Sequence, residues 1–404
     1  MTRTRWSLLL MATAAVGCGG ENELETCDIR EAACQREVFL AVQDVRGATW
    51  DPWLELPPMR VITRDDYRRE LEPALRWQAM MEPSFDYQTE ALKLLRLIDP
   101  NEEPNGETEF MISFVAAFYD SAQRSVTIID RGSDTNRRED VRTLAHELVH
   151  AAQERDVGFG RIYADAVTRD NIDAISSLLE GEATLYANLV DAKQAGLDSE
   201  NLGWRDYHTG WIEGIRQDIA KDVSPYRLAS TGLRYPLGSR YLTSAWLEGG
   251  PLAVRRVLDA RVTNTQRLLA GRGDAQDRPL TRWECARPDP PEGQELVLSD
   301  SLGAYAVFAF ATRVFGEDAA GWELAGEANG DRITVFGGAD EEVSVVWSLR
   351  FRSAEQAAEL EAAIAASPLI DAFQRVLEGD TLHVLASSRA LEDEYPTVAT
   401  PCGE

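Results

Sequence analysis

The 404-residue sequence predicts an α+β protein, with a mostly helical domain that contains a small β-hairpin or sheet and a small α+β segment at the C-terminal end. Apolar residues within 137–155 recur at the three- and four-residue spacing of one helix face. By contrast, 111–130 and 331–351 each contain two runs rich in β-branched and aromatic residues around a turn, which predicts hairpins. With 44% apolar residues, the chain is long enough to bury one large core or two.

Other elements follow from local signals. Thr63 with Asp66 three residues later, and Ser353 with Gln356, predict the first turns of two helices. Periodicity predicts a strand over 59–63, helices over 89–98, 172–190 (interrupted near Gly181), 211–222, 238–260 and 302–315, and a strand over 381–388.

The N-terminal residues predict export. Two arginines precede an apolar run over 6–16 that is too short to span a bilayer, so 1–17 is predicted to be a signal peptide. Residues 15–17 before Cys18 resemble a bacterial lipobox, which implies acylation of Cys18 and a lipoprotein of the bacterial cell envelope. Ordinary cleavage near "ATA", leaving a soluble exported protein, is the alternative. No later apolar run is long enough for a membrane helix, so we expect membrane attachment through acylated Cys18 only.

Four further cysteines, Cys27, Cys34, Cys285 and Cys402, predict two disulfides in an oxidising compartment. Three pairings are possible, and the short spacing of Cys27 and Cys34 suggests a local loop. On one continuous helix these two would lie about 10 Å apart along the axis, beyond the roughly 7 Å that a disulfide spans. Local pairing therefore predicts a turn within "CDIREAAC".

Composition divides the remaining chain into four regions. We expect a lipidated acidic tether with a short helix over 18–55, the large domain over 56–270, a linker rich in glycine and proline over 271–299, and the small α+β segment over 300–404. The net charge of −27 argues against nucleic acid or anionic lipid as a partner.

The helix predicted over 137–155 contains His146, Glu147 and His150. Because residues i and i+4 share one helix face, the two imidazoles can point at a single metal ion. Two imidazole nitrogens, a third protein ligand and one position left for water are typical of catalytic Zn²⁺. Glu147 can reach such a water as general base without ligating the ion. The spacing therefore predicts metal-assisted hydrolysis.

This motif followed by a Glu-Gly pair on a second helix resembles the gluzincin zinc metallopeptidases, in which the glutamate before glycine completes the zinc site. "LLEGEAT" supplies the pair, so the resemblance, which covers about 108–190, points to Glu180, thirty residues after His150. It implies a zincin-like catalytic domain and zinc-dependent hydrolysis of peptide or protein substrates. The gap is longer than in aminopeptidase-like gluzincins, so 155–171 would be an insertion between the two ligand helices.

Glu182 is the rival third ligand. On a helix it points about 200° away from Glu180, so both should not bind one ion, and the family's Glu-Gly order favours Glu180. A metzincin pattern would need a histidine where Asp156 stands. Asp173 or Glu182 is a candidate for orienting a ligand histidine.

Peptide hydrolysis also needs a donor for the tetrahedral oxyanion. The resemblance implies a tyrosine or histidine further along the chain, and the candidates are Tyr235 and His208. "YPLG" would break a helix beside Tyr235 and aim its side chain into the cleft, which favours Tyr235.

Two other functions stay open at this level. The chain could be a non-catalytic, zinc-stabilised surface lipoprotein that binds a protein or cell-wall partner, although mere ligation does not require Glu147. Alternatively, the C-terminal segment could be a binding module for which the large domain is a scaffold.

Overall fold

The structure is a computed structural model of the chain. It describes residues 27–47, 54–71, 86–101, 115–132, 136–164, 166–271, 280–281, 283, 288–367 and 373–389. The predicted signal peptide, Cys18, Cys285 and Cys402 lie outside these residues.

The fold is α+β, as the sequence predicts. The helices are α1 Ala32–Arg46, a short helix over 64–71, α3 Tyr87–Leu94, α5 Arg137–Asp156, α6 Phe159–Ala164, α7 Arg169–Gln194, α8 Trp204–Ile219, α9 Pro225–Gly232, α10 Arg234–Ala260, α11 Thr265–Ala270, α12 Ala304–Phe315, α13 Asp318–Gly326 and α14 Ala354–Ala366, with 3₁₀ turns η3 Ser199–Asn201 and η4 Ala339–Glu341. The strands are β1 Met59–Thr63, β2 Ala117–Asp120, β3 Ser125–Asp130, β4 Gln294–Asp300, β5 Ala328–Gly338, β6 Val343–Phe351, β7 Gln374–Glu378 and β8 Thr381–Ser387.

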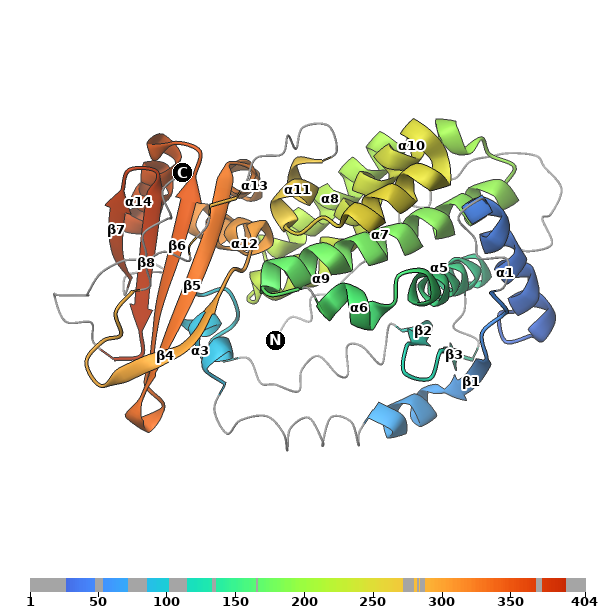
Figure 1. The fold of residues 1–404 in the computed structure, drawn as a ribbon, viewed down its shortest axis with the longest axis horizontal. Helices are drawn as coiled ribbons and strands as arrows, with labels where there is room; N and C mark the ends of the chain where they lie inside the picture. Colours follow the sequence, from blue (N-terminus) through green and yellow to red (C-terminus); the bar gives the residue numbers. More distant parts are fainter. Residues whose placement is uncertain are drawn as a thin grey trace.

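Two sheets lie at opposite ends of the helical layer (Figure 1). The small sheet has the order β1-β3-β2, and the larger one, at the left of the view, has the order β4-β5-β6-β8-β7. Every pair in the larger sheet is antiparallel. Apolar residues of the helices and of this sheet, such as Leu144 and Trp347, belong to one continuous buried cluster.

The small sheet forms where the sequence predicts it. The hairpin β2–β3 is antiparallel, and β1 pairs with β3 in parallel. The helix over 64–71 begins with the predicted cap, since the Thr63 hydroxyl accepts from the Asp66 N–H at 3.1 Å and the Asp66 carboxylate accepts from the Thr63 N–H at 3.2 Å. Within the described residues β2 pairs only with β3, so β2 is an edge strand beside α5.

Helix α7 runs without a break, so the interruption predicted near Gly181 is wrong. A Cβ atom on Gly181 would lie 2.2 Å from the carbonyl carbon of Gly238 on α10, and a Cβ on Gly238 would lie 1.7 Å from the carbonyl oxygen of Ser177. The two helices therefore cross with their backbones in contact. These glycines permit close packing rather than ending a helix.

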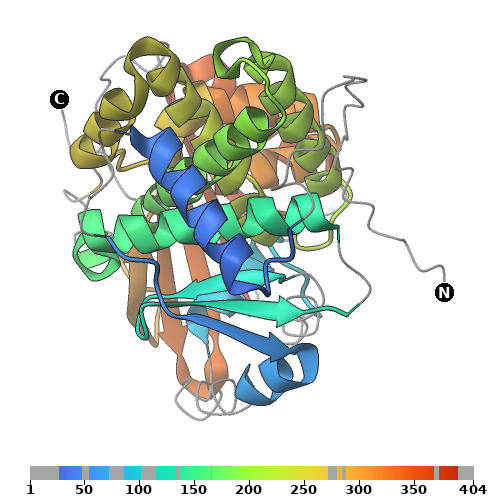
Figure 2. The same cartoon turned by 90° about the vertical axis from the view of Figure 1, so that its right-hand side faces the viewer.

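The disulfide Cys27–Cys34 confirms the local pairing, with a Cα–Cα distance of 5.5 Å. A turn at 29–30 precedes α1, which begins at Ala32, as that pairing requires. Helix α1 packs against α5 and α7, and Figure 2 shows it lying across α5. The helix predicted within the tether is thus part of the packed fold.

The C-terminal elements also follow the sequence closely. The predicted hairpin over 331–351 corresponds to β5 and β6, and the capping box of Ser353 and Gln356 is present. Residues 294–300 form the edge strand β4, so the end of the predicted linker belongs to the sheet. Among the described residues, no helix has both the length and the apolar character needed to cross a membrane.

Candidate metal centre

Helix α5 brings His146 and His150 together as their spacing predicts. Their Nε2 atoms lie 3.1 Å apart, and their ring centroids lie 4.7 Å apart. The opposite face of α5 holds the buried Val141, Leu144 and Leu148, which fix the rotation of the helix. Packing of the apolar face therefore directs both imidazoles to the same side.

Helix α7 supplies the third group. Glu180 Oε2 lies 3.0 Å from His146 Nε2 and 3.5 Å from His150 Nε2. The three possible ligand atoms lie within 4.8 Å of one another. Two imidazole nitrogens and one carboxylate oxygen form the donor set of many catalytic zinc sites, and all three side chains are part-exposed, which leaves access to solvent.

The rival ligand Glu182 points away from this group. Its Oε1 atom accepts from Arg46 Nη2 at 2.8 Å, and its Oε2 atom accepts from Gln153 Nε2 at 2.8 Å. The structure therefore brings Glu180, and not Glu182, to the histidines. The 200° separation along the helix explains this result.

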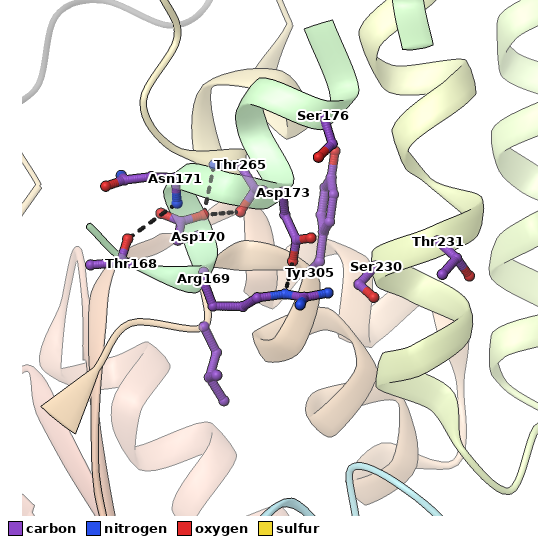
Figure 3. Close-up of polar contacts among 12 residues, drawn as sticks. Thr168, Arg169, Asp170, Asn171, Asp173, Ser176, Ser230, Thr231, Thr265 and Tyr305 are labelled. Atoms are coloured by element: carbon purple, nitrogen blue, oxygen red, sulfur yellow. Dashed lines mark hydrogen bonds and ion pairs between the residues drawn. The ribbon is translucent and has the colours of Figure 1, made fainter. Parts of the chain in front are cut away.

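Asp173 does not orient either histidine. Its two oxygens accept from Arg169 at 3.3 Å and from Arg234 at 2.7 Å. Figure 3 shows the contact with Arg169 at the start of α7. Asp173 therefore links α7 to the start of α10, and of the two candidates for orienting a ligand histidine, Asp173 is the wrong one.

Gln153, which the sequence analysis missed, contacts His150. Its Oε1 atom lies 2.7 Å from Nδ1 of His150, one helical turn earlier on α5. Its Nε2 atom donates to Glu182 and, at 2.9 Å, to the carbonyl oxygen of Leu179. A glutamine three residues after a predicted ligand on the same helix was the available signal.

Glu147 lies beside the trio but turns towards β2. Its Oε2 atom accepts from the backbone N–H of Tyr119 at 2.8 Å, and its side chain is buried. Burial raises the pKa of Glu147 above that of an ordinary glutamate, against the opposing effect of the two histidines. The edge strand thus positions the carboxylate that the motif predicts as general base.

The charges of the trio are strongly coupled. Burial disfavours a charged His150, but the Glu180 and Glu147 carboxylates and the hydrogen bond to Gln153 together outweigh burial and raise the pKa of His150 to about 9. Burial likewise opposes ionisation of Glu180, but the two histidines hold its pKa well below its usual range. A metal ligand must be deprotonated, so metal binding to this arrangement releases a proton.

Of the two predicted oxyanion donors, only Tyr235 lies beside the trio. Its ring centroid is 6.1 Å from that of His146, and burial together with the Glu180 charge and hydrogen bond raises its pKa. A helix boundary does lie beside Tyr235, since α9 ends at Gly232 and α10 begins at Arg234. "YPLG" itself lies in the first turns of α10, where proline is tolerated.

His208 lies elsewhere in the helical layer. It is buried, its Nε2 atom contacts Ser239 Oγ at 3.0 Å, and its ring stacks on Trp204. Burial lowers its pKa to about 4. These contacts are those of a packed side chain, and they do not include the trio, so the structure favours Tyr235 over His208 as the candidate donor.

The segment between the ligand helices contributes an aromatic contact to the trio. Phe159, in α6, makes edge contacts with the rings of His150 and Tyr119, at centroid distances of 6.2 and 6.3 Å. The predicted insertion over 155–171 therefore places an aromatic ring beside one candidate ligand.

Comparison of the chain with protein-family models, with curated proteins and with solved structures gives no match. The functional argument therefore depends on the side chains of this site.

Proposed function

We propose that the protein is a zinc-dependent peptidase of gluzincin type that hydrolyses peptide bonds with a metal-activated water. One observation carries the proposal: nitrogen atoms of two histidines on α5 and a carboxylate oxygen on α7 converge within 4.8 Å, next to a buried glutamate. His146, His150 and Glu180 are the proposed ligands of Zn²⁺. Zinc, when bound, supplies a Lewis acid that lowers the pKa of a water from about 15.7 towards 7.

Glu147 is the proposed general base. It follows His146 directly, and the Tyr119 N–H holds one of its oxygens. A carboxylate whose pKa is raised by burial accepts a proton more readily than an ordinary glutamate. We expect Glu147 to take a proton from the attacking water and to pass it to the leaving amine.

Tyr235 is the proposed donor to the oxyanion. Burial and the neighbouring carboxylates of Glu180 and Glu147 raise its pKa, so the hydroxyl stays protonated at neutral pH. A protonated hydroxyl can stabilise negative charge on a carbonyl oxygen that approaches the trio. His208 has no part in this proposal.

The edge strand β2 suggests how an extended peptide would bind. Within the described residues β2 pairs on one side only, and the Tyr119 N–H on this strand already contacts Glu147. A peptide added along this edge by main-chain hydrogen bonds would lie beside the proposed general base. Sequence-tolerant recognition of an unfolded peptide segment follows from such pairing.

We further propose that the enzyme is exported and anchored to the bacterial cell envelope through acylated Cys18. The signal-like segment over 1–17 and the small residues before Cys18 support this part of the proposal. A Cys18→Ala variant should move from the membrane fraction to the soluble fraction, and mass spectrometry of the parent should detect the acylated cysteine. A parent that is soluble and lacks acyl chains would contradict the anchor.

The decisive experiment for catalysis compares the parent with Glu147→Gln. We expect both to bind one zinc ion per chain and the variant to lose about 10²–10⁴-fold in kcat/KM on a peptide library, because only the general base is removed. Metal content by elemental analysis is the control. Zinc binding without cleavage by the parent would instead support a non-catalytic binding protein, and equal cleavage by the variant would contradict the mechanism.

A further inference from the structure

A buried chain of polar contacts connects His150 to the N-terminal helix α1. His150 Nδ1 lies 2.7 Å from Gln153 Oε1, and Gln153 Nε2 donates to Glu182 Oε2 at 2.8 Å. The other oxygen of Glu182 accepts from Arg46 Nη2 at 2.8 Å. Gln153, Glu182 and Arg46 are each only 1% exposed. Water therefore does not compete for these contacts.

The direction of each hydrogen bond in the chain is determined. The carboxylate oxygen of Glu182 and the carbonyl oxygen of Leu179 both accept, so Gln153 must turn its NH₂ group towards them. Its carbonyl oxygen then faces His150, and a neutral His150 must carry its proton on Nδ1. The lone pair is left on Nε2, the atom that faces Glu180. This is the tautomer that metal ligation through Nε2 requires.

Arg46 holds the far end of the chain in place. Besides Glu182 it pairs with Asp156 at 3.2 Å, and its guanidinium lies 5.5 Å from the ring centroid of Tyr186. It is the last residue of α1, the helix whose first turn contains Cys34 of the disulfide. Removal of Arg46 would leave Glu182 buried without this ion pair, which is costly, so we expect the carboxylate to shift and Gln153 to lose its anchor.

We propose that Arg46 is a positioning residue of the metal centre, which acts through Glu182 and Gln153 to fix the tautomer and orientation of His150. This inference rests on the proposed metal site. It makes α1 a part of that site, although Arg46 lies 104 positions before His150 in the sequence.

The test measures zinc dissociation constants of the full chain by competition with a chromogenic chelator. Loss of a hydrogen-bond partner of a metal ligand typically costs about 10–100-fold in affinity. We expect a loss of zinc affinity in this range for Gln153→Ala and a loss of about tenfold for Arg46→Met. Arg46→Lys keeps the charge but not the planar fork, so its zinc affinity should lie between those of Arg46→Met and the parent.

Arg255→Met is the matched control. Arg255 pairs with the same Asp156, at 3.2 Å, and its other ion-pair partner is Asp259 on its own helix, at 3.1 Å. We expect this variant to keep the parent's zinc affinity even if its melting temperature falls. Melting temperatures of all variants in a chelator separate loss of stability from loss of metal binding.

A second readout is the protonation of the ring nitrogens of His150, measured by NMR in the zinc-loaded protein. The parent should carry the proton on Nδ1, and Gln153→Ala should weaken the Nδ1–H hydrogen bond. Gln153→Ala leaves every ion pair in place, so it decides the question if Arg46→Met does not fold. Parent-like zinc affinity in Gln153→Ala and in folded Arg46→Met would overturn this inference alone, whereas a parent that binds no zinc would overturn the proposed function as well.

Discussion

Two acidic groups of helix α7 have very different surroundings: the buried Asp170 in its first turn and the part-exposed Glu180 in its middle. Asp170 accepts from the N–H and hydroxyl of Thr265, at 2.8 and 2.6 Å (Figure 3). Burial raises its pKa to about 7, whereas the histidines around Glu180 lower the pKa of that group. The partners of Asp170 are neutral donors that join α7 to α11. The partners of Glu180 are imidazoles that can share a metal ion.

The comparison shows that burial of a carboxylate does not by itself indicate a functional site. A carboxylate surrounded by hydrogen-bond donors serves packing, as Asp170 does. A carboxylate beside imidazole nitrogens forms a group in which a metal cation can take the place of the imidazole proton. The following predictions test this distinction, from the largest expected effect to the smallest.

The largest expected effect is the difference in zinc affinity between two neutral isosteric substitutions on α7. Glu180→Gln should weaken zinc binding by more than the roughly 10–100-fold expected for a lost hydrogen-bond partner of a ligand, because it removes a ligand. Asp170→Asn should leave zinc affinity unchanged. Chelator competition measures both values. Equal zinc affinity in the two variants would contradict the distinction.

Tyr235→Phe should lower kcat/KM by about 10²–10³-fold, the usual effect of losing one oxyanion donor. Zinc affinity should stay the same, since the tyrosine is not a ligand in this account. His208→Asn is the control, because His208 is buried against Ser239, and it should reduce activity only as far as it reduces the folded fraction. A larger loss of kcat/KM in His208→Asn than in Tyr235→Phe would reverse the two assignments.

The two acids also predict different pH dependences of the free energy of unfolding. The folded-state pKa of Asp170 is raised from 3.8 to about 7, so the folded state binds this proton more tightly and stability is lost as pH rises from about 4 to 7. His150, raised from 6.5 to about 9, contributes stability below pH 6.5 that is lost as pH rises through 9. Urea denaturation of the zinc-free protein measures both.

Two changes should separate the two pH ranges over which stability declines. Asp170→Asn should remove the decline between pH 4 and 7 and retain the one between pH 6.5 and 9. Saturating zinc should remove the second decline, because the bound metal takes the place of the proton on His150. A decline between pH 4 and 7 that persists in Asp170→Asn would assign it to another buried acid.

The smallest effect concerns the N-terminal cap of α7. The Thr168 hydroxyl accepts from the Asn171 N–H at 3.1 Å (Figure 3). Thr168→Ala should lower the free energy of unfolding by about 1 kcal/mol and leave zinc affinity unchanged. Denaturant titration provides the first value, and a change in zinc affinity would show that the start of α7 influences Glu180.

The candidate site could be predicted from the sequence where local geometry determines it. The i, i+4 spacing placed His146 and His150 on one helix face, and the resemblance selected Glu180. The hairpin beside α5 also follows from local β-propensity and turn residues. Long-range packing determines the rest. Gln153 has its partners on α7, and Arg46 reaches the site only because α1 packs across α5 and α7.

The errors have the same physical origin. Gly181 was interpreted as a helix break, because a single sequence cannot distinguish a flexible glycine from one that allows Gly238 of another helix to approach. The glycine- and proline-rich segment before 300 was expected to be a linker throughout, yet 294–300 pair with β5. In both places, contacts with residues distant in the sequence determine the local structure.

The most direct test of the central claim is the anomalous diffraction of zinc in crystals of the zinc-loaded protein. We expect one strong peak at the convergence of α5 and α7, about 2.0–2.2 Å from His146 Nε2, His150 Nε2 and a carboxylate oxygen of Glu180. A protein that takes up no zinc, or a peak whose ligands do not include both histidines, would contradict the claim.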